Sequence, residues 1–255
     1  MLYLVREYIN YRLKAKHRHG VHSPFVYKFN NECLRLNVDR ASRENFKSYF
    51  KTLRGSTSTI EMDDWGAGSK KLGTTRCVSK IAKVSGTQGK YANLLYRLTR
   101  YFEPENILEL GSSLGLGTLM LHQGHPSAHI TSVEGCEDTH AFLLAHHPLK
   151  NEKNVHFCRN DFLSYLQQSK NVFDLIFIDG AHNQEMTLKI LSKLKFHLHE
   201  ETIIVLDDIR WSTDMLKAWH EIVHDSTYHL TMDFFKLGII IPRQHQAKEH
   251  FIIRY

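Results

Sequence analysis

Five short apolar segments, each followed by an amphipathic stretch, constrain the fold of this chain most strongly. The apolar segments are residues 107–110, 130–133, 155–157, 173–178 and 203–206. The stretches that follow them have helical spacing, at residues 118–123, 139–146, 162–168, 184–196 and 213–224. Short apolar strands that alternate with helices predict an α/β fold in which helices cover both faces of a parallel sheet.

The last part of the chain departs from this alternation. Apolar segments at 228–235, 237–241 and 251–254 follow one another with no helical stretch between them. Strands joined without a helix pair in antiparallel fashion, so we expect an antiparallel strand near one edge of the sheet.

The first 105 residues have a different organisation. Helical spacing predicts helices over 2–16, from Pro24 after the N-cap residue Ser23, and over 43–53, 76–84 and 88–102. Residues 55–75 are rich in Gly, Ser and Thr, which predicts a long loop. We interpret this loop as a candidate lid with Trp65 as its large side chain. We therefore expect a basic helical cap over 1–84 and an α/β domain over 85–255.

Charge is distributed unevenly along the chain. Residues 1–90 contain 18 Lys and Arg against 7 Asp and Glu, a net charge of +11, whereas the whole chain carries +6. A solvated basic surface explains this excess, and so does a surface for an anionic substrate, nucleic acid or membrane. The sequence has no RNA-binding signature of aromatic residues and glycine, which disfavours nucleic acid as the partner.

Composition excludes several other classes of protein. A hydrophobic content of 42% and a charged content of 24% are typical of a globular chain and exclude disorder. No apolar run approaches the roughly 20 residues of a membrane span. Arg6 and Glu7 interrupt the segment that a signal peptide would need, and the four cysteines are widely spaced. We expect free thiols and a cytoplasmic protein.

The motif with the most chemical content follows the first predicted strand. Residues 107–119 read ILELGSSLGLGTL and place Gly111, Ser113, Gly115 and Gly117 between a strand and a helix. Glycines let a backbone approach a ligand closely, and a helix N-terminus offers unpaired N–H groups. The spacing is neither that of a dinucleotide fold nor that of a P-loop. Glu109, at the strand's end, is a candidate acceptor for a cationic amine or for N–H groups of the loop.

Acidic residues also follow the second and third predicted strands. Glu134, followed by Gly135, is placed to accept hydrogen bonds from the two ribose hydroxyls of an adenosine. Asp161, followed by Phe162, is a candidate acceptor for an adenine amino group. A helix N-cap is an equally good explanation of Asp161.

These motifs, in this order, resemble those of class I S-adenosylmethionine-dependent methyltransferases, and the resemblance covers residues 76–255. It implies a Rossmann-like doubly wound sheet of seven strands in the order 3-2-1-4-5-7-6, with strand seven antiparallel. It also implies that the glycine loop binds the methionine portion, Glu134 the ribose and Asp161 the adenine. Gly86 lies in a segment similar to the one that closes over the methionine end.

Three carboxylates follow the next two strands. Asp179 ends strand four, and Asp207 and Asp208 end strand five. Carboxylates at adjacent strand ends make an oxygen-rich site suited to Mg²⁺ or another divalent cation, although Asp208 is also a candidate N-cap. The arrangement is similar to that of cation-dependent catechol-type and macrolide-sugar O-methyltransferases, a resemblance that implies Asp179 as a metal ligand and catalytic residue.

Two further residues are candidates for the acceptor side. His182 stands where catechol-type enzymes have a lysine base, and a neutral imidazole could remove a proton from an acceptor hydroxyl. Trp211 follows the aspartate pair and is a candidate wall of the acceptor pocket. Ordinary packing or helix capping explains either residue as well.

The function that we predict is S-adenosylmethionine-dependent O-methylation of a hydroxyl of a small molecule or sugar, with divalent-metal assistance. The basic N-terminal third would favour an acidic or phosphorylated acceptor. Two alternatives remain open: a metal-independent methyltransferase acting on RNA or another macromolecule, and a cofactor-binding module without catalysis. An edge strand and an amphipathic first helix would also allow a homodimer.

Overall fold

The computed structural model describes residues 2–17, 20, 22–62, 74–84 and 87–255, in two compact units. The central unit comprises residues 36–169, and the terminal unit combines residues 1–35 with 170–255. The boundary expected between residues 84 and 85 falls inside the central unit. The division into a cap and a methyltransferase domain stays a prediction about function.

The central unit contains a parallel three-stranded array in the order β3-β4-β5. Its strands are β3 (Asn106–Leu110), β4 (His129–Glu134) and β5 (Val155–Arg159), and a separate antiparallel pair is formed by β1 (Thr59–Met62) and β2 (Thr74–Cys77). Its helices are α3 (Arg40–Gly55), α4 (Val78–Val84), α5 (Gly89–Phe102), α6 (Leu116–Gly124), α7 (Glu137–His146) and α8 (Phe162–Gln168).

Helices α5 and α6 pack closely because a glycine lies where they meet. A Cβ atom on Gly124, the last residue of α6, would lie 2.4 Å from the carbonyl oxygen of Tyr96 in α5. Leu95 and Leu98 of α5 are fully buried, as are Ile107 and Leu108 of β3. Helix α6, which follows the glycine loop, is thereby packed closely against α5 in the core of the central unit.

The prediction of a continuous loop over 55–75 is wrong at both of its ends. Residues 59–62 form β1 and residues 74–77 form β2, which pair in the register Thr59 with Cys77. Thr, Ile and Cys favour extended backbone, and the partner strand supplies hydrogen bonds that a local reading of Gly, Ser and Thr does not reveal. Trp65 and the rest of 63–73 lie outside the described residues.

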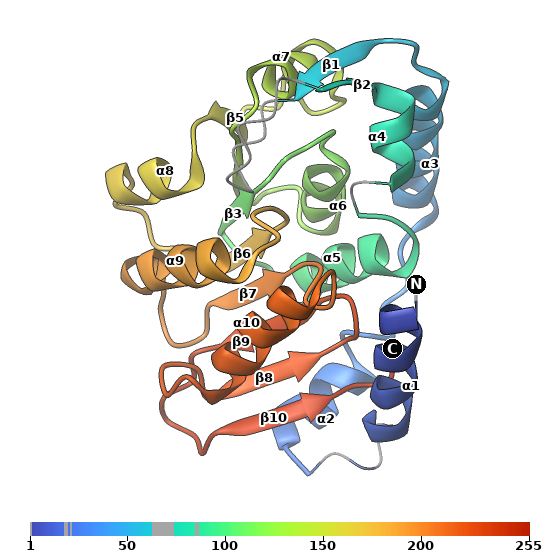
Figure 1. Cartoon of the computed structure of the whole chain (residues 1–255). Coiled ribbons are helices and arrows are strands. Elements are labelled where there is room, and N and C mark those ends of the chain that lie inside the picture. Colours follow the sequence, from blue (N-terminus) through green and yellow to red (C-terminus); the bar gives the residue numbers. More distant parts are fainter. Residues whose placement is uncertain (1, 18–19, 21, 63–73, 85–86) are drawn as a thin grey trace. The chain divides into compact units, whose positions relative to one another are not determined.

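The terminal unit contains five strands in the order β6-β7-β9-β8-β10 (Figure 1). These strands are β6 (Leu175–Ile178), β7 (Ile203–Leu206), β8 (Leu230–Asp233), β9 (Gly238–Ile241) and β10 (Glu249–Ile252). The helices are α1 (Leu2–Lys14), α2 (Pro24–Asn31), α9 (Gln184–Leu194), the short 3₁₀ helix η2 (Lys195–His197) and α10 (Thr213–His224). Strand β9 runs antiparallel to both of its neighbours, and β10 pairs in parallel with β8.

These orders agree with the predicted topology. Counted along the chain from β3, the central unit has the order 3-2-1 and the terminal unit the order 4-5-7-6, with strand seven antiparallel. The α/β, Rossmann-like fold class is therefore confirmed. The seven-strand count is wrong by one, because residues 249–252 add β10 beside β8.

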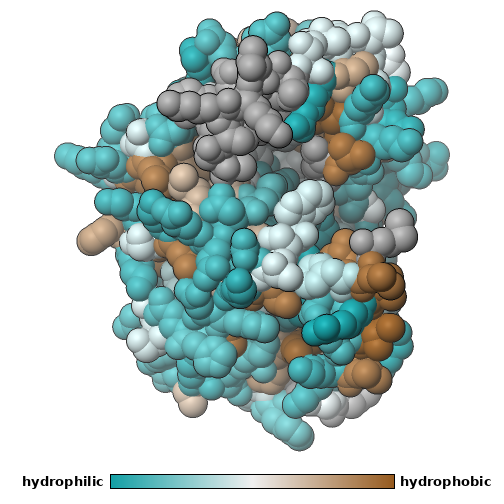
Figure 2. Space-filling model, in the orientation of Figure 1, coloured by the Kyte–Doolittle hydropathy of each residue, from teal (hydrophilic) through white to brown (hydrophobic). Residues whose placement is uncertain are grey.

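In the terminal unit, β10 runs toward α1, and the residues that follow each element pair with one another (Figure 1). Tyr11, the buried residue of α1, donates a hydrogen bond to the Ile253 carbonyl, and Lys16 bridges to Ile253. Figure 2 shows apolar residues gathered over α1, where Leu2, Leu4, Val5, Tyr8, Ile9 and Leu13 are exposed. The homodimer stays a prediction.

Among the described residues, every helix is too short or too polar to cross a lipid bilayer.

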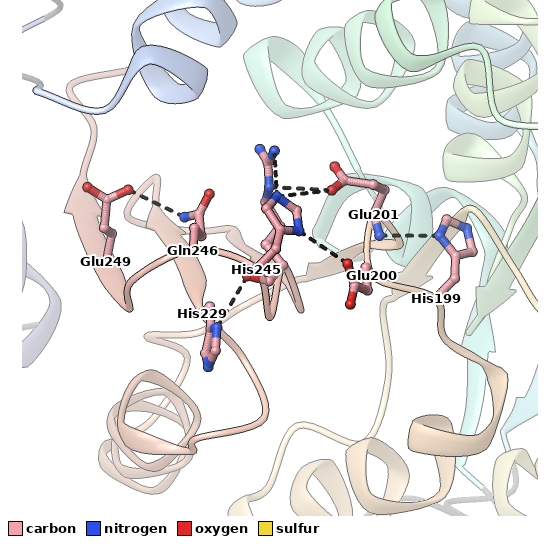
Figure 3. A network of polar contacts seen from close by, with 8 residues as sticks. His199, Glu200, Glu201, His229, His245, Gln246 and Glu249 are labelled. Carbon is pink, nitrogen blue, oxygen red and sulfur yellow. Dashed lines mark hydrogen bonds and ion pairs between the residues drawn. The ribbon is translucent and has the colours of Figure 1, made fainter.

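A polar network stabilises the amino end of β7 (Figure 3). His245 Nδ1 lies 3.1 Å from a carboxylate oxygen of Glu200, and Arg243 Nε lies 3.5 Å from one of Glu201. The Arg243 guanidinium also stacks 4.2 Å from the ring centre of Phe25. This network lies at the opposite end of β7 from Asp207 and Asp208, so it stabilises the fold without contributing to the candidate site.

Candidate active site

The glycine loop connects β3 to α6 through backbone conformations that favour glycine. Gly111 has φ 103° and Gly115 has φ 74°, and both lie in the region that L-residues rarely adopt. Ser113, at φ 46°, adopts this region without being glycine. The Gly111 N–H donates to the Val133 carbonyl at 2.9 Å, which connects the loop to the end of β4.

A histidine outside the glycine loop forms a hydrogen bond to the last residue of that loop. His147 Nδ1 accepts from the Leu149 N–H at 3.1 Å, so the ring proton is on Nε2, which donates to the Gly115 carbonyl at 2.9 Å. A Cβ on Gly115 would lie 2.3 Å from His147 Cδ2. Burial lowers the pKa of His147 to about 4, so the ring is neutral at pH 7. The sequence analysis did not identify His147.

Tyr49 of α3 supplies a second contact to the same turn. Its hydroxyl donates to the Leu114 carbonyl at 2.8 Å, and its ring packs edge-on against His147 with centroids 5.2 Å apart. Two consecutive loop carbonyls therefore have buried donors from outside the loop. A loop held in this way is preorganised for a ligand.

Glu109 is buried, with 1% of its surface exposed, and its carboxyl group accepts hydrogen bonds from the hydroxyls of Thr118 and Ser132. Burial raises the pKa of Glu109 to about 7, against the lowering effect of the two hydroxyls, and the nearby charge of Glu134 raises it further. Among the described residues, the groups that donate to Glu109 are therefore hydroxyls of α6 and β4, whereas the sequence analysis expected a cationic amine or N–H groups of the loop.

Glu134, at the end of β4, connects the second strand to the glycine loop. Its two carboxylate oxygens accept from the N–H groups of Ser113 and Cys136, each at 2.9 Å. Burial raises the pKa of Glu134, and these N–H donors work in the opposite direction. The structure therefore brings Glu134 to Ser113, as a shared ligand site would require.

Of the residues that the structure describes, the other cofactor residues predicted in the central unit lie in or beside α6, β4 and α8. Asp161 caps α8 by accepting from the Ser164 N–H at 3.0 Å, and Phe162 is the first residue of that helix. Gly117 is buried in α6, and Gly135 follows Glu134. The N-cap role of Asp161 is established by this hydrogen bond, and its adenine role stays a prediction. Gly86 lies outside the described residues.

In the terminal unit, a lysine forms ion pairs with the two aspartates that follow β7. Lys236 Nζ lies 3.2 Å from Asp207 Oδ2 and 3.7 Å from Asp208 Oδ1. Asp207 is 2% exposed, and its other oxygen accepts from the Asp208 N–H at 2.7 Å. Asp208 adopts φ 53°, which Asp tolerates better than most residues.

The charges of this cluster influence one another. Burial raises the pKa of Asp207 well above its usual value, and the negative charges of Asp179 and Asp208 raise it further. Burial alone would lower the pKa of Lys236, but the three carboxylates outweigh that effect and raise it. The cluster therefore contains a protonated lysine amid three carboxyl groups.

The predicted divalent-metal site does not fit these residues. Across the part of the chain that the structure describes, no three His, Cys, Asp or Glu side chains are placed to hold a metal ion together. Both oxygens of Asp207 already have protein donors. The sequence analysis missed Lys236, because only the antiparallel register of β9 beside β7 brings it to the aspartates.

His182 and Trp211 lie near each other and are exposed. Their ring centroids are 6.2 Å apart with an interplanar angle of 41°. Trp211 has 62% of its surface exposed, which is unusual for the largest apolar side chain. His182 follows Asp179 by three residues, and Ala181 between them adopts φ 56°, so the chain turns sharply at this strand end. The structure brings the two predicted acceptor residues together.

A family comparison covers both units. Residues 108–209 match the family model described as "Methyltransferase domain". The matched segment is a methyltransferase domain. This region begins in β3 and ends just after the aspartate pair, so it includes the glycine loop, Glu134, Asp161 and Asp179. The prediction of a class I S-adenosylmethionine-dependent methyltransferase is confirmed at the level of family and fold.

Known proteins similar to this methyltransferase chain include both solved structures and a curated relative. An O-methyltransferase from Bacillus cereus in complex with SAH has a TM-score of 0.55 at 16% identity, over 85% of this chain and 96% of that one. The SAH-bound methyltransferase PaMTH1 from Podospora anserina has the same TM-score and identity, over 81% and 97%. An uncharacterized RNA methyltransferase from Mycoplasma mobile is 26% identical in an alignment of 201 residues that covers 74% of this chain. The matched region spans only 54% of that relative.

Proposed function

We propose that this chain transfers a methyl group from S-adenosylmethionine to a hydroxyl oxygen of a small molecule, with His182 as the general base. Bound S-adenosylmethionine supplies an electrophilic methyl group on a sulfonium. The chain's own residues must bind that cofactor, orient the acceptor and remove its proton. A divalent metal is not included in the proposal, because Lys236 already pairs with two of its expected ligands.

The residues of the central unit suit this cofactor. A preorganised turn at Gly111–Gly115 leaves no room for side chains at Gly115. Two carboxyl groups, Glu109 and Glu134, have raised pKa values because burial disfavours their charged forms. A ligand that carries net positive charge would favour their ionised forms. On this proposal Ser113, Glu134 and Gly135 bind the cofactor's polar groups.

One observation carries the choice of a small acceptor: His182 and Trp211 expose an imidazole and an indole 6.2 Å apart at the end of β6 and β7. An exposed indole offers a flat apolar surface for an acceptor, and a nearby imidazole nitrogen can accept the proton of the acceptor hydroxyl. Beyond this base, methyl transfer mainly requires that the acceptor oxygen be aligned with the sulfonium methyl group.

The direct test is methyl transfer by His182→Gln, with His220→Gln as the control because His220 is an exposed histidine on α10. We expect His182→Gln to lower kcat by about 10²-fold or more while the affinity for S-adenosylhomocysteine stays unchanged. Trp211→Ala should raise KM with a smaller effect on kcat. Full turnover in His182→Gln would refute the base assignment.

A second candidate acceptor is RNA. The curated relative from Mycoplasma mobile is described as an RNA methyltransferase, and residues 1–90 carry a net charge of +11. Binding through phosphate contacts would weaken steeply as salt rises. Salt-dependent RNA binding together with label transfer from S-adenosylmethionine to RNA would favour this candidate over the small acceptor.

A panel of neutral, acidic and phosphorylated small acceptors separates the remaining possibilities. Preference for acidic or phosphorylated compounds would support a role of the basic N-terminal residues in acceptor choice. Uniform turnover of neutral compounds would contradict that role. Cofactor binding without transfer to any acceptor in the panel, or to RNA, would support the non-catalytic module.

A further inference from the structure

We propose that the Lys236 ammonium is the resident cation of the cluster formed by Asp179, Asp207 and Asp208, so that these carboxylates need no divalent ion. The inference rests on the proposed function for the importance of this cluster. Its test measures cation binding rather than methyl transfer, so the two can fail separately.

The sheet topology brings Lys236 to the aspartates. Strand β9 pairs antiparallel to β7 with Gly238 opposite Leu206. In an antiparallel pair, the residues before one strand lie opposite those after the other. Lys236, two residues before Gly238, therefore lies opposite Asp208, two residues after Leu206. The Ile209 N–H donates to the Lys236 carbonyl at 3.0 Å, which continues this pairing beyond the strands.

A buried ion pair stabilises the turn that carries Lys236. Arg210 donates to both carboxylate oxygens of Asp233 at 2.8 Å and 2.6 Å, and one of its nitrogens also donates to the Phe235 carbonyl at 2.9 Å. Phe235 has φ 74°, and its N–H donates to Asp233 at 2.8 Å. The lysine is thus carried on a turn with fixed backbone, which limits the ways in which its ammonium can leave the cluster.

Both carboxylate oxygens of Asp207 already accept hydrogen bonds from protein groups. Oδ1 accepts from the Asp208 N–H, and Oδ2 accepts from Lys236 Nζ. A small divalent ion such as Mg²⁺ requires ligand oxygens at about 2.1 Å in near-octahedral geometry. It would have to displace the Lys236 ammonium, which pairs with Asp207 and Asp208 and whose side chain is only 30% exposed.

The decisive experiment compares Mn²⁺ binding to the full chain and to Lys236→Met, by electron paramagnetic resonance and by the shift in melting temperature. Methionine is an unbranched side chain one heavy atom shorter than lysine, and it removes the charge. Lys217→Met is the matched control, because Lys217 forms an exposed pair with Asp214 at 3.2 Å. We expect Lys236→Met to bind Mn²⁺ at least about tenfold more tightly than the wild-type chain and Lys217→Met.

The expected gain in Mn²⁺ affinity must depend on the aspartate cluster. Adding Asp207→Asn to Lys236→Met should abolish the new Mn²⁺ binding. Equal Mn²⁺ affinity in the wild-type chain and Lys236→Met overturns the proposal, as does a wild-type Mn²⁺ site that Asp207→Asn removes. If Lys236→Met does not fold, Lys236→Gln carries the same expectation, and the wild-type measurement retains its power to refute.

These outcomes are independent of the proposed reaction. Mn²⁺ binding is measured without acceptor or S-adenosylmethionine, so a wrong acceptor leaves it unaffected. Conversely, a failed cation result leaves the His182 assignment to be decided by its own variant.

Discussion

His147 donates a hydrogen bond from Nε2 to the Gly115 carbonyl over 2.9 Å, and the same ring occupies the space that a side chain at position 115 would need. The two residues are 32 positions apart in the sequence. Their contact holds the turn between β3 and α6 that the proposed cofactor requires. It therefore makes the stability of the central unit and the geometry of its ligand loop depend on the same pair.

Gly115→Ala should destabilise the protein by roughly 2–4 kcal/mol, because the new methyl group meets His147 at 2.3 Å and the backbone has φ 74°. Urea unfolding measures this change. Gly135→Ala is the control, since a Cβ there has the Asn160 carbonyl oxygen at 3.8 Å as its nearest neighbour, and its free energy of unfolding should hardly change. Equal effects of the two substitutions would contradict the assigned contact.

Acidification should destabilise the protein through His147. Its pKa is about 4 in the folded state, below the value of 6.5 for an unfolded chain, so the unfolded state binds more protons between these values. Stability contributed by neutral His147 is present above pH 6.5 and is lost as pH falls toward 4, by about 3 kcal/mol in all. His147→Phe should lose this component in urea titrations between pH 7 and 4. An unchanged pH profile in His147→Phe would show that the ring is not buried neutral.

Glu109 should produce a pH dependence of the opposite sign. Its pKa of about 7 exceeds the unfolded value of 4.5, so the folded state binds more protons in this interval. Stability is therefore lost as pH rises from 4.5 to 7, again by about 3 kcal/mol. Glu109→Gln should be more stable than the wild-type protein at pH 8 without cofactor, but not at pH 4.5. Loss of stability at both pH values would mean that the carboxylate is compensated in the folded state.

The buried pair of Arg210 and Asp233 should matter more than exposed pairs. Asp233→Asn leaves a buried guanidinium without its counter-charge and should cost roughly 3–5 kcal/mol in unfolding free energy. Asp214→Asn removes the exposed partner of Lys217 and should cost less than about 1 kcal/mol. Comparable melting temperatures for the two variants would argue against stabilisation of the β8–β9 turn by the Arg210–Asp233 ion pair.

Local sequence patterns predicted most of the fold. The helix predicted over 213–224 and the strand over 203–206 agree with α10 and β7. Such elements are determined by periodicity within a short window, because one apolar face must be buried wherever the segment lies. The prediction failed at 55–75, where β1 and β2 depend on each other for their hydrogen bonds.

The chain's sequence by itself determined the order of elements, the glycine turn and the acids that follow each strand, since these are properties of neighbouring residues. Only the tertiary structure decided which distant groups complete the sites. His147 reaches Gly115 through packing beside β5, and Lys236 reaches Asp207 through the antiparallel register of β9. The lysine changes the chemistry expected of the cluster. Its positive charge interacts with the three carboxylates, which on their own would indicate a metal site. A pairing between strands has no periodicity within either strand, so no local pattern could have revealed it.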